Sequence, residues 1–540
     1  METHLEREYK FDVDPGFDPP DLRPVVGRTE RLPQQRLTTT YYDTPDLALW
    51  EQGITLRFRV EVSGDGPPED DRTGDRARAG KWTLKLPAMD AGAEAAGSEG
   101  SGDRWELTWK ADGARVPDQA VAVVCGLVRN QTLQPVVVLQ ATRRRLLLQG
   151  AADRPWGEID DDLVEVTSGA RQGLRFRQME LELLGDAEPA EAAAAGTAGV
   201  ADVADVAEVV DALRRAGAAP GGGSKFALAA GLDGSRPGLD GSRPGPADGG
   251  GSLRQVVGAI LRADANRWLE ADYRLRVPAG DGDPGRPDPA VVQLALGALR
   301  QWRAHLGAFE QGLDPVWSRH LRADLARLEE LLEVLRIEDA VLQLVVDHAD
   351  PDDAEQAAEL RGLLSADRHL GALDLVEELQ SAPYQEALGR MAASRHAPPL
   401  IGVDPDGRAA PFLRAALATR WRRARRSARS SVAGTEATGA KRFGRLADTA
   451  RACEPHLGRR AGRLASAAQE VSDALTDVVD ARAAAHRLRE TALHPAVTPA
   501  VAFVAGRVAG RAEAGASRRA DRARRAATRL SRRHAAAWLD

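Results

Sequence analysis

The chain has 540 residues, 28% charged and 43% hydrophobic, with a formal net charge of −7. This length exceeds what one hydrophobic core supports, so we expect two or three domains. No apolar run is long enough to cross a membrane, and the N-terminus lacks the apolar segment of a signal peptide. Two cysteines, Cys125 and Cys453, exclude a disulfide framework and favour a cytoplasmic location.

The first residues set the pattern for the N-terminal third. If the stretch from Leu5 to Phe11 is a strand, Glu6, Glu8 and Lys10 project from one face and apolar side chains from the other. Two carboxylates and an ammonium on one face are more than a solvated surface requires. They favour a wet cavity that holds a cation and an anion together.

The same alternation recurs as far as about residue 184. The charged positions that it places on the same face as Glu6, Glu8 and Lys10 are Arg57, Arg59, Lys85, Arg104, Glu106, Arg144, Glu158, Asp160, Glu180 and Glu182. A closed, eight-stranded antiparallel β-barrel with a charged lumen accounts for both signs of charge better than an open sheet does. The runs 143–145 and 158–162 leave the register of two strands open, and Arg143 is the alternative to Arg144.

The lumen residues suggest a chemistry. Carboxylates without histidine or cysteine suit a hard cation, Mg²⁺ or Mn²⁺, and a row of arginines and lysines suits a ligand with several phosphates. We therefore expect attack of water on a terminal phosphoryl group. The alternative is a barrel with internal salt bridges and no catalysis.

The second half has a different pattern. A helix is expected at 201–218, followed at 232–252 by a twice-repeated Gly-Leu-Asp-Gly-Ser-Arg-Pro segment that reads as a flexible linker. From 253 to 540 the apolar spacing is helical throughout, which predicts an all-α bundle. The predicted domains are therefore an α+β barrel domain at 1–231 and a helical domain at 253–540.

Several motifs of the N-terminal part resemble those of the CYTH family, the triphosphate tunnel metalloenzymes. The Glu6-Arg7-Glu8-Tyr9-Lys10 segment matches the family's ExExK signature, and 41–59, 82–85, 142–144 and 180–182 resemble its later motifs in the right order. The resemblance implies that the metal is held by Glu6, Glu8, Glu158, Asp160, Glu180 and Glu182. It also implies that the catalytic set is Glu6 and Glu8 with the triphosphate-gripping Lys10, Arg57, Arg59, Lys85 and Arg144; Arg104 joins the substrate-binding set from its position in the lumen.

The helical part resembles a CHAD domain, a histidine- and arginine-rich module associated with inorganic polyphosphate. Its basic helices imply a polyphosphate site made of Arg300, Arg303, Arg420, Arg423, His456, Arg459 and Arg463. Their spacing predicts that His456, Arg459 and Arg463 share one helical face.

The sequence leaves three functions open. The first is a metal-dependent triphosphatase acting on inorganic triphosphate, with polyphosphate bound by the helical domain. The second is a polyphosphate scaffold with little turnover, and the third is an adenylate cyclase or thiamine triphosphatase on the same barrel. Membrane partners are not expected, and few aromatic residues are available to stack nucleic-acid bases.

Overall fold

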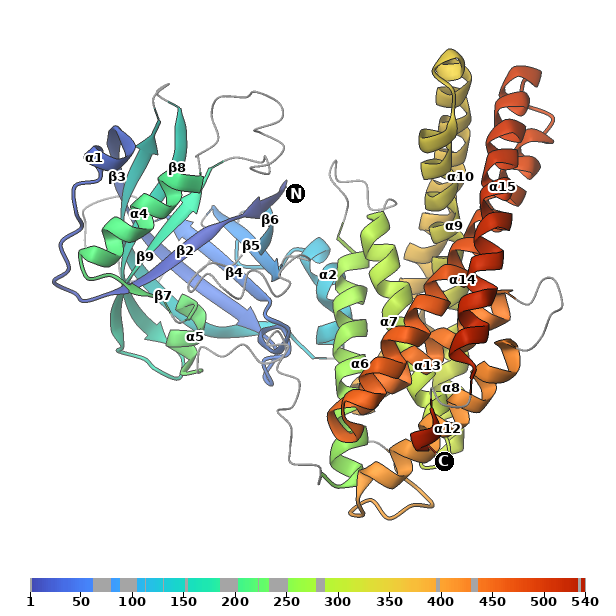
Figure 1. Ribbon diagram of the computed structural model, residues 1–540. Helices are drawn as coiled ribbons and strands as arrows, with labels where there is room; N and C mark the ends of the chain where they lie inside the picture. The colour runs from blue at the N-terminus through green and yellow to red at the C-terminus, as the bar shows by residue number, and fades with distance from the viewer. Residues whose placement is uncertain are drawn as a thin grey trace. The chain divides into compact units, whose positions relative to one another are not determined.

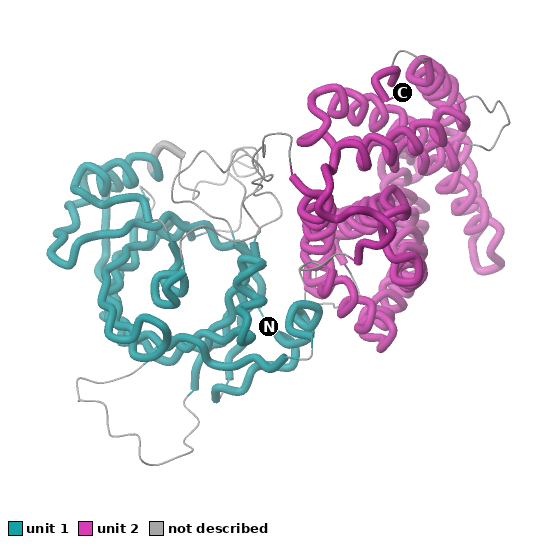
Figure 2. The backbone as a smooth tube through the Cα atoms, turned by 90° about the horizontal axis from the view of Figure 1, so that it is seen from below, with its two compact units in different colours: residues 1–241 teal, residues 242–540 magenta. Residues whose placement is uncertain are grey.

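The computed structural model divides into two compact units, residues 1–241 and 242–540, which Figure 2 colours separately. The expected linker at 232–252 lies largely outside the described residues, which include only 232, 251 and 252 of it. The structure describes residues 2–61, 79–87, 104–111, 113–129, 131–150, 154–184, 203–221, 223–232, 251–277, 287–394, 399–428, 436–532 and 536–539.

The first unit is built on one antiparallel sheet. Its strands follow the spatial order β1-β6-β5-β4-β3-β7-β8-β9-β2-β10. Their bounds are β1 Glu2–Glu6, β2 Glu8–Val13, β3 Arg28–Asp43, β4 Thr55–Glu61, β5 Gly80–Pro87, β6 Arg104–Ala111, β7 Gln134–Gln149, β8 Pro155–Ser168, β9 Arg175–Leu183 and β10 Ala219–Pro220.

The sheet closes on itself because β1 and β2 are consecutive parts of one extended stretch, interrupted only at Arg7. β1 pairs with β6 at one edge of the sheet, and β2 pairs with β9 near the other. The Arg7 carbonyl accepts a hydrogen bond from the Leu183 amide at 2.9 Å, so the stretch stays attached to β9 across the interruption. The result is the ring seen in Figure 2. The sheet has ten strands and not eight, because Arg7 splits the first strand and β10 adds a two-residue strand.

Part of the outward face of the barrel is apolar and is covered by a helix. Phe11, Ile159, Met179 and Leu181 form a buried cluster with α4 (Val203–Arg215), which crosses β8 and β9 in Figure 1. Two further short helices of this unit are α1 (Arg23–Val26) and α2 (Asp118–Val128). Since alternate side chains point to opposite faces, this cover leaves the charged positions on the inside.

One end of the barrel is apolar inside. Val137, Leu139, Val164 and Val166 belong to the inward face of β7 and β8 and pack with Phe226 of α5 (Lys225–Ala230). The hydroxyl of Ser224 caps α5 by accepting from the Ala227 amide at 3.2 Å. α5 therefore fills this end of the barrel.

A buried carboxylate holds the loop that supports α5. Asp43, at the end of β3, accepts hydrogen bonds from the amides of Thr44, Leu49 and Trp50 at 2.7, 2.9 and 3.0 Å. Burial raises the pKa of Asp43 to about 6, although these hydrogen bonds act in the opposite direction. The 3-10 turn Trp50–Gln52 is thereby fixed, and the Trp50 ring lies 5.4 Å from that of Phe226.

The second unit is helical: its described residues contain no β-strand element, only two isolated β-bridges. Its α-helices are α6 Leu253–Leu275, α7 Pro289–Ala308, α8 Pro315–Asp324, α9 Ala326–His348, α10 Ala354–Gln380, α11 Ala382–Ser394, α12 Ala409–Ala428, α13 Glu436–Leu457, α14 Arg459–Ala492 and α15 Pro499–Leu530.

Local sequence explains where several of these helices begin. Ser252 and Gln255 form a capping box at α6, while Asp288 and Thr498 cap α7 and α15 directly before a proline. The expected class, an antiparallel β-barrel domain followed by an all-α domain, is confirmed. Within the described ranges, no helix is both long and apolar enough to span a bilayer.

Candidate functional site

The barrel interior gathers charged side chains from nearly every strand. In the register of the sheet, Lys10 faces Glu180 and Glu8 faces Glu182 across β2 and β9, while Glu6 faces Arg104 across β1 and β6. Glu6, Glu8 and Arg104 are buried, with 6%, 4% and 3% of their surface exposed. Alternation along the strands thus directs acids and bases into one enclosed space.

One group of contacts centres on Lys85 of β5. Its ammonium donates to Glu6 at 2.5 Å and contacts Glu106 at 2.8 Å, and Arg57 of β4 reaches the same Glu106 at 3.5 Å. Burial would raise the pKa of Glu106, but Lys85 and Arg57 lower it to about 2. Burial would lower the pKa of Lys85, but Glu8, Glu106 and Glu6 raise it above its usual range.

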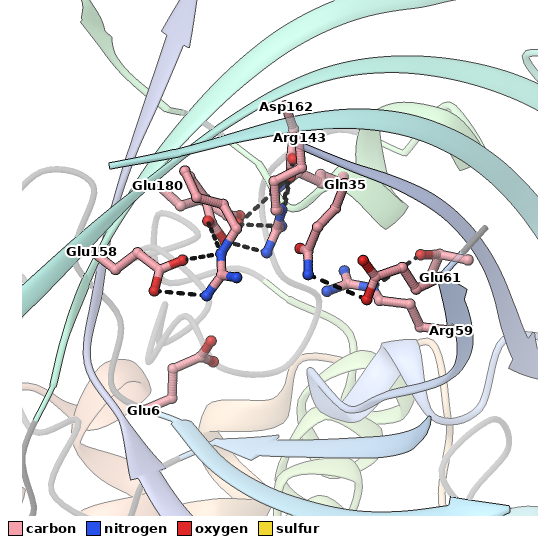
Figure 3. A network of polar contacts seen from close by, with 12 residues as sticks. Glu6, Gln35, Arg59, Glu61, Arg143, Glu158, Asp162 and Glu180 are labelled. Carbon is pink, nitrogen blue, oxygen red and sulfur yellow. Dashed lines mark hydrogen bonds and ion pairs between the residues drawn. The ribbon is translucent and has the colours of Figure 1, made fainter. Parts of the chain in front are cut away.

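A second group centres on Arg143 of β7 (Figure 3). Its guanidinium donates to both oxygens of Asp162 at 2.8 and 2.7 Å, pairs with Asp160 and lies 3.9 Å from Glu180. Beside it, Arg145 donates to Glu158 at 2.5 and 3.0 Å. Glu158, Asp160 and Asp162 therefore share the inward face of β8, which fixes the register that the sequence left open.

The expected inward position of Arg144 is wrong, and the alternative, Arg143, occupies it. Arg144 is exposed and pairs in register with Asp161, which points outward and contacts Arg177 at 2.8 Å. Arg143 and Arg145 occupy the inward positions on either side of it. Three consecutive arginines give no alternation, so only the pairing of β7 with β8 determines which of them point inward.

Lys225 was not among the predicted site residues because it belongs to no strand. It reaches from the first turn of α5 to Glu180 at 2.6 Å and to Asp162 at 3.1 Å, and it is only 7% exposed. Burial would raise the pKa of Glu180, but Lys225, Lys10 and Arg143 hold it well below its usual range. The available signal was a lysine directly after a helix-capping serine.

Charge in the interior is unevenly distributed. Burial together with Arg57 and Arg143 lowers the pKa of Arg59 to about 10, and its guanidinium donates to Thr39 at 3.2 Å. On the acidic side, burial and Glu6 raise the pKa of Glu182 to about 7. Burial likewise raises the pKa of Asp160 to about 7, although Arg143 opposes it. An anion near Arg59 and a cation near Glu182 would relieve both imbalances.

The possible metal ligands in the barrel interior suit a hard divalent cation. They are carboxylates throughout, and the buried Oδ1 atom of Asp160 has no hydrogen-bond partner. As the side chains are placed, the carboxylates contact lumen lysines and arginines, and no cluster of three metal-binding groups is preformed in the described part of the chain. A bound cation would therefore replace the lumen lysines and arginines as the partner of the carboxylates. An incoming anion could then accept hydrogen bonds from those side chains.

The helical unit gathers a group of arginines that we call the helical arginine cluster: Arg303, Arg322, Arg420, Arg423 and Arg445. Burial, Arg423 and Arg445 lower the pKa of Arg420 to about 10, although Glu310 opposes them. Burial, Arg322 and Arg423 likewise lower the pKa of Arg445. Helices α7, α8, α12 and α13 thus bring together five guanidinium groups, of which Arg303 pairs with Glu329 and Arg322 lies 3.7 Å from Glu310.

Other expectations for this unit need correction. His456, Arg459 and Arg463 do not share a helix face, because α13 ends at Leu457 and Gly458 adopts φ +76° before α14 begins. Arg300 and Arg303 lie on α7 as expected, but they form ion pairs with Glu333 and Glu329. Arg322 and Arg445 were not predicted, since they come from helices whose packing the sequence does not reveal.

A closed antiparallel barrel with a charged interior, joined to a basic helical unit, defines a two-domain tunnel protein. The CYTH domain model matches residues 4–208 and the CHAD domain model matches residues 259–489. The chain is therefore a CYTH–CHAD protein, and its N-terminal domain has the triphosphate tunnel fold.

Sequence relatives include two uncharacterized proteins from two strains of Mycobacterium tuberculosis. Each is 33% identical over 196 residues, or 34% of this chain and 33% of the relative, so the match spans about a third of the relatives' length.

Each of the similar solved structures covers about half of this chain or less. PptA from Streptomyces chartreusis is 17% identical, with a TM-score of 0.38 over 52% of this chain and 99% of that one. The CHAD domain from the plant Ricinus communis is 19% identical, with a TM-score of 0.40 over 49% and 88%. A Hippeastrum protein described as having a dominant triphosphatase activity is 15% identical, with a TM-score of 0.24 over 42% and 96%.

Proposed function

We propose that the CYTH domain hydrolyses triphosphate, preferably inorganic triphosphate, with Mg²⁺ or Mn²⁺, and that the CHAD domain binds inorganic polyphosphate. The observation that carries the proposal is that the strands direct bases and carboxylates into the same enclosed space, where burial and like-charged neighbours disfavour the charged forms of both Arg59 and Glu182. Cys125 and Cys453 form no disulfide, which accords with a cytoplasmic location.

The basic residues would bind the substrate. Arg57, Arg59 and Arg143 present planar guanidinium groups that match phosphate oxygens in pairs, while Lys10, Lys85 and Lys225 add point charges. In the absence of substrate, a carboxylate contacts each of Lys10, Arg57, Lys85, Arg143 and Lys225. Binding would exchange those contacts for phosphate oxygens, which also frees the carboxylates.

The freed carboxylates would hold the cation. Glu6, Glu8, Glu158, Asp160, Glu180 and Glu182 are the proposed ligands. A divalent ion bound there would supply Lewis-acid polarisation of the phosphate chain. A carboxylate of this set that the cation does not engage would accept the proton of an attacking water. The lumen arginines and lysines would then stabilise the charge that develops on the transferred phosphoryl group.

Binding with little turnover remains the second candidate, and one observation favours it. Four interior carboxylates, Glu6, Glu8, Glu158 and Asp160, already contact lumen bases, which is the arrangement of a barrel stabilised by salt bridges. Phosphate release from triphosphate, ATP, thiamine triphosphate and long polyphosphate, with Mg²⁺ or Mn²⁺, separates the two functions. Turnover of triphosphate that EDTA abolishes supports hydrolysis, whereas retention of polyphosphate without release supports the scaffold.

A further inference from the structure

The last helix carries a row of arginines that the catalytic and CHAD assignments leave unused. Arg518, Arg522, Arg525 and Arg529 of α15 are exposed and follow the spacing i, i+4, i+7, i+11, so they lie on one face. We call them the α15 arginine row. It extends for ~17 Å along the helix and lies beyond residue 489, where the CHAD match ends.

The helix presents this row rigidly. On its opposite side Ala516, Ala520, Ala523 and Ala527 are buried, with at most 4% of their surface exposed. Alanine has no side-chain freedom to lose, which lets α15 pack closely and fixes its orientation. The arginines therefore form a preorganised line of positive charge.

Other arginines of the same helix are neutralised within the protein. Arg507 contacts Asp350 at 2.9 Å and pairs with Asp353, Arg511 contacts Asp350 at 3.1 Å, and Arg524 contacts Asp521 at 2.8 Å. By contrast, the described residues provide no hydrogen bond or ion pair to any member of the α15 arginine row. All of these positions are arginines, so whether one is paired depends on the acidic side chains that lie near it.

The residues around the α15 arginine row exclude several classes of ligand. No large apolar or aromatic side chain is exposed between residues 514 and 532, so neither membrane insertion nor a protein partner with buried anchors fits. Single-stranded nucleic acid would lack a stacking surface. A straight row on a convex helix suits a slim linear polyanion better than a duplex, whose phosphates wind away from a straight contact.

We propose that the α15 arginine row is a second binding site for inorganic polyphosphate, separate from the helical arginine cluster and engaged only by chains long enough to extend along it. This proposal rests on polyphosphate binding by the helical unit. Because the row provides no specific pocket, binding there depends strongly on salt and on chain length.

The test uses the full-length protein with R518Q, R522Q, R525Q and R529Q combined. Affinity for a long inorganic polyphosphate chain is measured by titration calorimetry over a series of salt concentrations. If each arginine contacts one phosphate, the slope of log affinity against log salt falls by about 3 units, on the scale of single-stranded polyanions. Affinity at low salt falls at least ~10-fold, while binding of tripolyphosphate is unchanged. Glutamine keeps helix propensity, and circular dichroism verifies the fold.

Two controls separate the possible outcomes. R507Q combined with R511Q removes positive charge from the same helix at paired positions and should leave the slope unchanged. R322Q combined with R445Q tests the helical arginine cluster.

If the quadruple variant binds long chains as the wild type does while the cluster variant does not, the second site is refuted and the proposed function stands. If the wild type shows no salt-dependent binding at all, both fail. Tighter binding of duplex DNA than of polyphosphate would also overturn the assignment.

Discussion

At the scale of single residues, two neighbouring side chains of β7 lie in opposite environments. Arg143 lies in a buried network with Asp160 and Asp162, whereas Arg144 is exposed on the outer face. We predict that R143A lowers kcat/KM for triphosphate by ~10²–10³-fold, the usual effect of losing a donor that stabilises the transition state. R144A should have less than a twofold effect. The measurement is steady-state phosphate release at a temperature where both variants remain folded. Equal losses in the two variants would contradict the register.

The raised pKa of Glu182 makes the stability of the metal-free protein depend on pH. Burial and Glu6 raise this pKa to about 7, so the folded state retains a proton that the unfolded state has lost above its ordinary pKa. Stability therefore falls as pH rises from about 5 through 7, by on the order of 2–3 kcal/mol. Urea unfolding in EDTA at pH 5, 6, 7 and 8 should show this loss in the wild type, and E182Q should reduce it. Parallel curves for the two proteins would show that Glu182 titrates normally.

At the scale of elements, α5 contributes both a charge and an apolar wedge. Phe226 is 2% exposed and lies 5.2 Å from the Tyr41 ring and 5.4 Å from the Trp50 ring. F226A should lower the free energy of unfolding of the N-terminal domain by about 3–5 kcal/mol, because it leaves a cavity. Phe503 of α15 is 65% exposed, so F503A should change stability by no more than ~0.5 kcal/mol. Thermal unfolding of both variants provides the comparison.

The packing of the helices predicts which arginines bind polyphosphate. R322Q with R445Q removes charge from the helical arginine cluster, whereas R459Q with R463Q removes equal charge from exposed positions of α14. We expect the first pair to weaken binding of inorganic polyphosphate by at least ~10-fold, since hydrogen bonds to charged groups contribute about 1.5–3 kcal/mol each. The second pair should have little effect. Similar losses would indicate binding by net charge alone, which calorimetry at two salt concentrations would reveal.

Sequence reasoning succeeded where alternation was unbroken. In β2, β4, β5 and β9 a charged or polar residue alternates with an apolar one and defines the inward face, and the structure places those faces as expected. It failed where local pattern carries no information. The arginine run of β7 could face either way, Lys225 enters from a helix outside the sheet, and Gly458 breaks an apparently continuous basic helix. The helical arginine cluster depends on contacts between helices far apart in sequence, which no local pattern encodes.

At the scale of the whole molecule, the two units have separate hydrophobic cores. A fragment that ends at residue 241 should therefore retain EDTA-sensitive triphosphate hydrolysis within about threefold of the full chain, while retention on immobilised polyphosphate is lost. Each function is measured on the fragment and on the full-length protein side by side. Loss of hydrolysis from a folded fragment would show that the helical unit takes part in turnover.

The apolar end of the barrel has a consequence for how long substrates are processed. Because Phe226 and the valines around it block that end, a phosphate chain cannot thread through the domain. Substrate and product must use the same opening of the barrel, and only the end of a phosphate chain can reach the carboxylates. Any long polymer degraded here should consequently shorten stepwise from its termini, without mid-chain cuts.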